Sequence, residues 1–165
     1  MSKSSLKHVV ICGVSGAGKS TVARAIALEI DGQYADADDF HSDDAKQKMA
    51  SGSPLTDEDR FPWLDCLSEY LNQAETPVVL ACSALKSMYR ERLNASGNVS
   101  FIVLNLSQEA AYKRVKQRSS EHFMPESLVN SQFAALEIAE DCSIVNAEQT
   151  IDDVVQDCLD TMKSE

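Results

Sequence analysis

Basic residues are scarce in this sequence. Its 165 residues include 15 lysines and arginines against 26 aspartates and glutamates, which gives a formal net charge of −11. Such a chain repels the phosphate backbone of nucleic acids and the surface of anionic membranes. We therefore expect no nucleic-acid partner, and we expect the few cations to gather where an anionic ligand binds.

Long apolar runs and paired cysteines are also missing. No run approaches the ~20 residues of a membrane-spanning helix, so no membrane partner is expected. Residues 1–7 lack the apolar stretch of a secretion signal. The cysteines are odd in number and form no C-x-x-C pair, which indicates neither a zinc site nor a disulfide framework. The cysteines are Cys12, Cys66, Cys82, Cys142 and Cys158. Because they indicate no disulfide framework, we expect a protein of the reducing cytoplasm.

The chain has the length of one ordinary α/β domain, and 44% of its residues are hydrophobic. Short apolar runs alternate with segments of helical spacing, without a repeat or a linker between them. This alternation predicts a single domain, 1–165, with a parallel sheet covered by helices on both faces. The expected strands are 9–11, 33–37, 78–82, 101–106 and 143–145. The expected helices are 21–30, 43–51, 83–93, 108–117 and 150–162, with two more that begin at Pro62 and Pro125.

One stretch between the first strand and the first helix fits G-x-x-x-x-G-K-[ST], the P-loop pattern. Its glycines allow a tight turn whose N–H groups point at phosphate, and the helix N-terminus favours the same anion. Lys19 would reach the β- and γ-phosphates, and the Ser20 hydroxyl would bind Mg²⁺. The pattern predicts a site for ATP and Mg²⁺ built from Gly13, Val14, Ser15, Gly16, Ala17, Gly18, Lys19, Ser20 and Thr21.

An acidic cluster follows the second predicted strand. Asp36 and Asp38 would share one face of that strand, at the nucleotide edge of the sheet. Because no acid ends the strand 78–82, Asp36 is the better candidate to hold Mg²⁺. Asp38 would then orient an acceptor hydroxyl and take its proton. The alternative is a solvated acidic turn.

Two arginines four residues apart, Arg114 and Arg118, share one face of a predicted helix. They suit a lid over residues 114–125 that neutralises a phosphoryl group in transit. The alternative is a solvated basic face. His122 lies in the same stretch and is either a site residue or a structural histidine.

Other polar residues are candidates for an acceptor site. Ser83, Lys86 and Arg90 follow the end of the third strand and either line that site or face water. Arg60 either binds an acceptor carboxylate in a bidentate pair or is held by its acidic neighbours. His41 is again either a site residue or a structural one.

Three longer strings resemble the gluconokinase family. Residues 48–64 are similar to its K-M-x-x-G-x-P-L-x-D-x-D-R-x-P-W-L segment, and residues 82–90 to C-S-A-L-K-x-x-Y-R. Residues 122–137 are similar to H-F-M-P, then S-Q-F-x-x-L-E. With the P-loop, the matches run in family order from residue 9 to about residue 137.

The resemblance implies transfer of phosphate from ATP to the 6-hydroxyl of D-gluconate. It implies the three-layer P-loop kinase fold shared with nucleoside monophosphate and shikimate kinases, a sheet order of 2-3-1-4-5, a small mobile lid and often a homodimer. Lys19, Asp38 and Arg118 become the expected catalytic residues. The expected acceptor-binding residues are Asp38, His41, Lys48, Arg60, Ser83, Lys86, Arg90, His122 and Gln132.

The sequence departs from the family pattern beside the expected acceptor site. Ala37, Ser42 and Ala45 replace the usual Gly, Pro and Asn, and residues 119–121 lack a frequent Gly. A kinase of another small hydroxy acid, such as shikimate or a related sugar acid, is one alternative. Shikimate kinases place three glycines where this chain has residues 82–84. A P-loop switch module that controls a partner is the other alternative.

Overall fold

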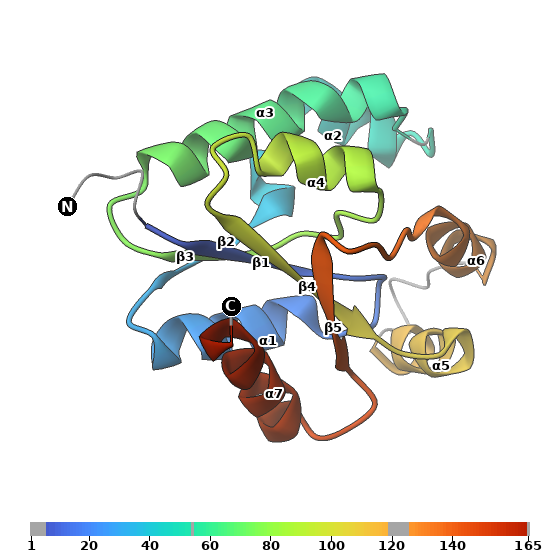
Figure 1. The fold of residues 1–165 in the computed structure, drawn as a ribbon. Coiled ribbons are helices and arrows are strands. Elements are labelled where there is room, and N and C mark those ends of the chain that lie inside the picture. The colour runs from blue at the N-terminus through green and yellow to red at the C-terminus, as the bar shows by residue number, and fades with distance from the viewer. Residues whose placement is uncertain (1–5, 54, 119–125, 165) are drawn as a thin grey trace.

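The computed structural model describes residues 6–53, 55–118 and 126–164. Its centre is a five-stranded sheet in the order β2-β3-β1-β4-β5, with every neighbouring pair parallel (Figure 1). The order confirms the one implied by the family resemblance. The strands are β1 (His8–Cys12), β2 (Gln33–Asp36), β3 (Val78–Ala81), β4 (Val99–Asn105) and β5 (Cys142–Asn146).

Helices cover both faces of the sheet, as the alternation of elements predicts (Figure 1). Val9 and Ile11 of β1 pack toward α1 (Lys19–Glu29) and α7 (Ile151–Lys163). Val10 and Cys12 point the other way, toward α3 (Asp57–Gln73) and α4 (Ser87–Leu93). The central strand is buried at every position and apolar from Val9 to Cys12, because both of its faces are covered.

The remaining helices lie around the carboxyl edge of the sheet. A 3-10 turn, η2 (Ala37–Phe40), follows β2 directly, and α2 (Asp43–Ala50) comes next. At the other end, α5 (Gln108–Arg118) packs on α6 (Glu126–Ala135) (Figure 1). No helix in the described part of the chain is both long enough and apolar enough to cross a membrane.

Two helices begin elsewhere than the sequence predicts. We expected α3 to start at Pro62, but it starts at Asp57 because Thr56 and Asp59 form a capping box. The Asp59 N–H donates to Thr56 Oγ1 at 3.1 Å, and the Thr56 N–H donates to Asp59 Oδ2 at 2.9 Å. We expected α4 to start at residue 83, but it starts at Ser87. Ala84 has a φ of +39°, which no helical residue adopts.

Candidate active site

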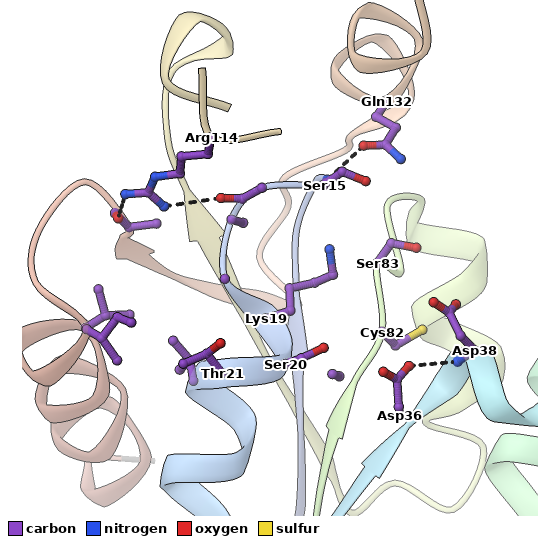
Figure 2. Close-up of a pocket in the computed structure, with 18 of the residues that line it drawn as sticks. Ser15, Lys19, Ser20, Thr21, Asp36, Asp38, Cys82, Ser83, Arg114 and Gln132 are labelled. Carbon is purple, nitrogen blue, oxygen red and sulfur yellow. Dashed lines mark hydrogen bonds between the residues drawn. The ribbon is translucent and has the colours of Figure 1, made fainter. Parts of the chain in front are cut away.

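A cavity of about 820 Å³ opens at the carboxyl edge of the sheet. Segments that lie far apart in the sequence meet there, because the parallel strands all end at this edge. Figure 2 shows Lys19 and Ser20 on the P-loop side of the cavity and Asp36 and Asp38 on the β2 side. The lining includes residues 15–22, Asp36, Asp38, Ser83, Arg114 and Gln132.

The P-loop has the backbone that an anion cradle requires. Gly16 has a φ of +88°, and a Cβ there would lie 3.0 Å from the carbonyl oxygen of Ala111, so only glycine fits. Gly18 precedes α1 and makes no side-chain cap, which leaves the first amides of the helix directed at the cavity. Lys19 extends from this turn, and its Nζ donates to the carbonyl oxygen of Val14 at 3.0 Å.

Two oxygen donors in the cavity suit Mg²⁺. Ser20 offers a hydroxyl and Asp36 a carboxylate, and both line the cavity beside the phosphate cradle. Mg²⁺ bound with nucleotide phosphates usually takes only one or two protein ligands of this hard type. The pair therefore fits the metal that the P-loop implies.

Asp38 does not share a strand face with Asp36, because β2 ends at Asp36 and η2 begins at the next residue. The Asp38 N–H donates to Asp36 Oδ1 at 2.9 Å, and both carboxyl groups still line the cavity. Partial desolvation raises the pKa of Asp38, and the neighbouring Asp36 carboxylate raises it further. A carboxylate with a raised pKa binds a proton more readily, as a general base must.

Arg114 connects two loops across the cavity. Its guanidinium donates to the carbonyl oxygen of Gly16 at 3.2 Å and to that of Ala147 at 2.7 Å (Figure 2). The side chain of Arg118, the whole of His122 and most of the expected lid lie outside the described residues.

Gln132 reaches the P-loop from α6. Its Oε1 accepts a hydrogen bond from the Ser15 N–H at 2.8 Å (Figure 2). That amide belongs to the phosphate cradle, so a bound phosphate oxygen would have to replace the Gln132 oxygen. The sequence placed Gln132 with the acceptor; the structure places it against the donor cradle.

Four expected acceptor-binding residues lie outside the cavity lining, near the N-terminus of α3. Lys48 Nζ lies 2.5 Å from Asp59 Oδ2, and Lys86 Nζ lies 3.0 Å from Asp57 Oδ1. The hydrogen bond from Lys48 lowers the pKa of Asp59 to about 2. Each lysine thus already has a carboxylate partner. The four residues are His41, Lys48, Arg60 and Lys86.

Arg60 is held by a backbone carbonyl and a tyrosine. Its guanidinium donates to the carbonyl oxygen of Leu55 at 2.8 Å and to the hydroxyl of Tyr89 at 3.3 Å, and among the described residues no acidic neighbour contacts it at hydrogen-bond distance. The Tyr89 hydroxyl in turn donates to Asp57. Arg60, Tyr89, Asp57 and Lys86 consequently form a connected polar network with three charged members.

His41 stacks on Trp63, with ring centroids 4.2 Å apart and planes 15° apart. Desolvation lowers the pKa of His41, against an opposing effect of the Asp38 carboxylate. Within the described part of the chain, its buried Nδ1 has no hydrogen-bond partner.

The structure corrects the expectation for Arg90. Instead of reaching the cavity or facing water, Arg90 is completely buried. Its guanidinium is enclosed by an acid and by backbone carbonyls, so no donor points at a ligand.

Several lining residues escaped the sequence analysis. Ala147 directly follows β5, so the rule that parallel strands end at one edge would have indicated it. Ile151 and Val154 of α7 also line the cavity and are apolar side chains of the kind that an aromatic ring packs against. The residues missed were Val22, Ala81, Cys82, Gln117, Ala147, Gln149, Ile151 and Val154.

Comparisons with known proteins agree with this geometry. The family model for shikimate kinase matches residues 15–163. The chain is 42% identical over 153 residues to the gluconokinase of Arabidopsis thaliana, which covers 82% of this chain and 80% of that protein. It is 39% identical over 139 residues to the gluconokinase of Gluconobacter oxydans, covering 82% and 78%. The crystal structure of a gluconokinase from Sinorhizobium meliloti superposes with a TM-score of 0.87 at 36% identity, covering 96% and 92%.

Proposed function

The chain belongs to the gluconokinase family, and from that premise we propose that it transfers the γ-phosphoryl group of ATP to the 6-hydroxyl of D-gluconate. The products are 6-phospho-D-gluconate and ADP. A single observation carries the proposal beyond nucleotide binding: a carboxyl group with a raised pKa, Asp38, faces the same cavity as the phosphate cradle.

The P-loop forms the donor half of the site in this proposal. The amides of residues 14–20 and the Lys19 ammonium bind the β- and γ-phosphates, and Arg114 keeps the surrounding loops in place. Ser20 and Asp36 hold Mg²⁺, which when bound neutralises charge that builds on the phosphate oxygens. The apolar surface of Ile151 and Val154 receives the adenine ring.

Asp38 acts on the acceptor. Its carboxylate accepts the hydrogen bond of the 6-hydroxyl and takes its proton as the oxygen forms a bond to the γ-phosphorus. The bond between that phosphorus and the β–γ bridging oxygen breaks, and ADP leaves. The raised pKa of Asp38 supports this role.

The polar network near α3 is proposed to recognise the rest of gluconate. Ser83 lines the cavity, and Lys86, Arg60, His41 and Lys48 lie beyond it. The acceptor carboxylate would compete with Asp57 for Lys86 and with Asp59 for Lys48. A group of cationic and hydrogen-bonding side chains of this kind suits an acid that carries several hydroxyl groups. Arg118, His122 and the expected lid over 114–125 would close over both substrates and exclude water.

The shikimate alternative has less support. The shikimate kinase family model matches residues 15–163, whereas eight relatives at 34–42% identity are named as gluconokinases or probable gluconokinases. The strand that would precede a glycine triplet continues here into Cys-Ser-Ala.

The test measures ADP release from Mg-ATP with gluconate, with shikimate, with other sugar acids and without acceptor. We expect ADP release with gluconate to exceed the release without acceptor, and we expect an equal amount of 6-phosphogluconate to form. Asp38→Asn should lower kcat by a factor of about 10² or more, the scale of general-base losses, while ATP still binds. Asp39→Asn, an exposed neighbour outside the cavity lining, is the matched control. Gluconate turnover no faster than the no-acceptor rate would refute the proposal.

A further inference from the structure

Arg90 carries a buried charge that the proposed chemistry does not use. Its side chain has no exposed surface. Its Nε donates to Asp141 Oδ2 at 2.8 Å, and this ion pair compensates the charge. The other two nitrogens contact the carbonyl oxygens of Ala84, Leu85 and Glu137 and the hydroxyl of Ser87.

The carbonyls that Arg90 binds belong to the connection between β3 and α4. Nη1 lies 2.8 Å from the oxygen of Ala84 and 3.3 Å from that of Leu85. Ala84 is buried and has a φ of +39°, a conformation in which an alanine Cβ is strained. Such strain persists only where surrounding contacts hold the backbone in that conformation. Arg90 provides two of these contacts, to the carbonyl oxygens of Ala84 and Leu85.

A second group, Glu137, secures the same connection from the segment that follows α6. The Glu137 N–H donates to the oxygen of Leu85 at 2.7 Å, and Glu137 Oε1 accepts from the Ser87 N–H at 2.8 Å. Arg90 Nη2 lies 2.6 Å from the Glu137 carbonyl oxygen. Arg90 therefore holds the connection directly and also holds the segment that supports it.

The connection carries two of the proposed acceptor contacts. Ser83 lines the cavity, and its carbonyl accepts from the Gly13 N–H at 3.2 Å. Lys86 reaches across to Asp57. Both residues flank the strained Ala84, so a change in its backbone would move both.

We propose that Arg90 is a positioning residue for the acceptor. Without touching substrate, it fixes the strained backbone at Ala84, so that Ser83 faces the cavity and Lys86 reaches the N-terminus of α3. This inference rests on the proposed function, which places gluconate beside these two residues. It predicts that Arg90 governs acceptor binding and leaves donor binding unchanged.

The test compares Arg90→Lys with wild type. We expect KM for gluconate to rise at least tenfold, while Kd for ATP without acceptor changes less than twofold. Arg92→Lys is the matched control, because Arg92 lies on the same helix but pairs with Asp65 at the surface. If Arg90→Lys does not fold, Asp141→Asn weakens the same clamp from its partly exposed side and should change KM in the same direction. Equal changes in KM and Kd, or unchanged KM in the folded variant, would overturn the inference.

Ala84→Gly distinguishes the positioning role of Arg90 from a purely structural role. Glycine adopts a positive φ without the Cβ penalty, so the connection would need the clamp less. We expect the factor by which Arg90→Lys raises KM to be at least threefold smaller in the Ala84→Gly background. Equal factors in the two backgrounds would show that Arg90 does not act through the strained residue.

Hydrogen exchange separates a failure of this inference from a failure of the proposed function. If wild type does not phosphorylate gluconate, the proposed function fails, whatever Arg90 does. Arg90→Lys should still accelerate amide exchange over residues 84–89 and leave residues 13–20 unchanged. Acceleration of both segments to the same degree, or of neither, would overturn the positioning role.

Discussion

Replacing Arg114 by methionine removes the connection between the P-loop and the loop after β5. Two hydrogen bonds are lost, to Gly16 at 3.2 Å and to Ala147 at 2.7 Å. A hydrogen bond from a charged donor contributes ~1.5–3 kcal/mol net. The first bond is long and the side chain is only half-buried, so we take the lower end for each and expect a loss of about 3 kcal/mol.

A loss of that size has a measurable thermal consequence. For a protein of 150–250 residues, 1 kcal/mol corresponds to roughly 2–4 °C in Tm, so Arg114→Met should lower the Tm of the ligand-free protein by about 6–12 °C. Circular dichroism during heating measures this directly. Lys113→Met, at the exposed neighbouring position on α5, is the control and should shift Tm by less than 2 °C.

The same substitution should weaken ATP binding, because both loops line the nucleotide cavity. We expect Kd for ATP to rise about tenfold, which corresponds to 1.4 kcal/mol. A Tm within 2 °C of wild type would show that the two bonds do not hold the loops together. A lowered Tm with unchanged Kd would show that the loops do not shape the nucleotide site.

Four further outcomes are expected. Desolvation and the Asp36 carboxylate raise the pKa of Asp38. The catalytic carboxylate is protonated when the pH falls through this raised pKa, so kcat/KM should begin to fall at a pH above the ordinary pKa range of aspartate. Ionising this group at pH 7 also costs folding stability, so Asp38→Asn should raise the urea midpoint there although it removes activity. Thr56→Ala removes the α3 cap and should lower the free energy of unfolding by about 1 kcal/mol in urea titration, with Thr56→Ser restoring most of it. Trp63→Phe loses the 2.7 Å hydrogen bond from Nε1 to the Ala37 carbonyl oxygen and should lower the free energy of unfolding by about 1 kcal/mol in the same assay. An unchanged urea midpoint in Thr56→Ala or in Trp63→Phe would contradict the role given to that contact.

Local signals were sufficient for the phosphate cradle of the P-loop, although not for the rest of the nucleotide cavity. The P-loop pattern, the apolar β1 and the helical spacing of α1 all lie within 30 residues, so the sequence predicted their structure directly. The start of α3 was missed because Pro62 looked like a first-turn proline. Its missing N–H removes only the bond to the Glu58 carbonyl, and the capping box at Thr56 starts the helix earlier.

The acceptor half depends on contacts that are remote in sequence. Arg90 reaches Glu137 and Asp141, 47 and 51 residues away, and no local pattern distinguishes a buried arginine from a surface one. Full burial of arginine is also uncommon. Motif similarity correctly marked residues 82–90 as a unit, but it could not tell which members face a ligand and which hold the backbone.

The strand order also determines when the chain can fold during its synthesis. β1 is made first, yet its sheet neighbours β3 and β4 span residues 78–81 and 99–105. All five residues of β1 are buried in the finished protein. In the nascent chain this segment therefore has no sheet partner until about half of the polypeptide has been translated, and it lacks its second partner until about two thirds has been translated. Closing such long loops is slow, and exposed apolar strands are prone to aggregation meanwhile. The central position of β1 in the sheet therefore also makes it an apolar segment that chaperones can protect during synthesis.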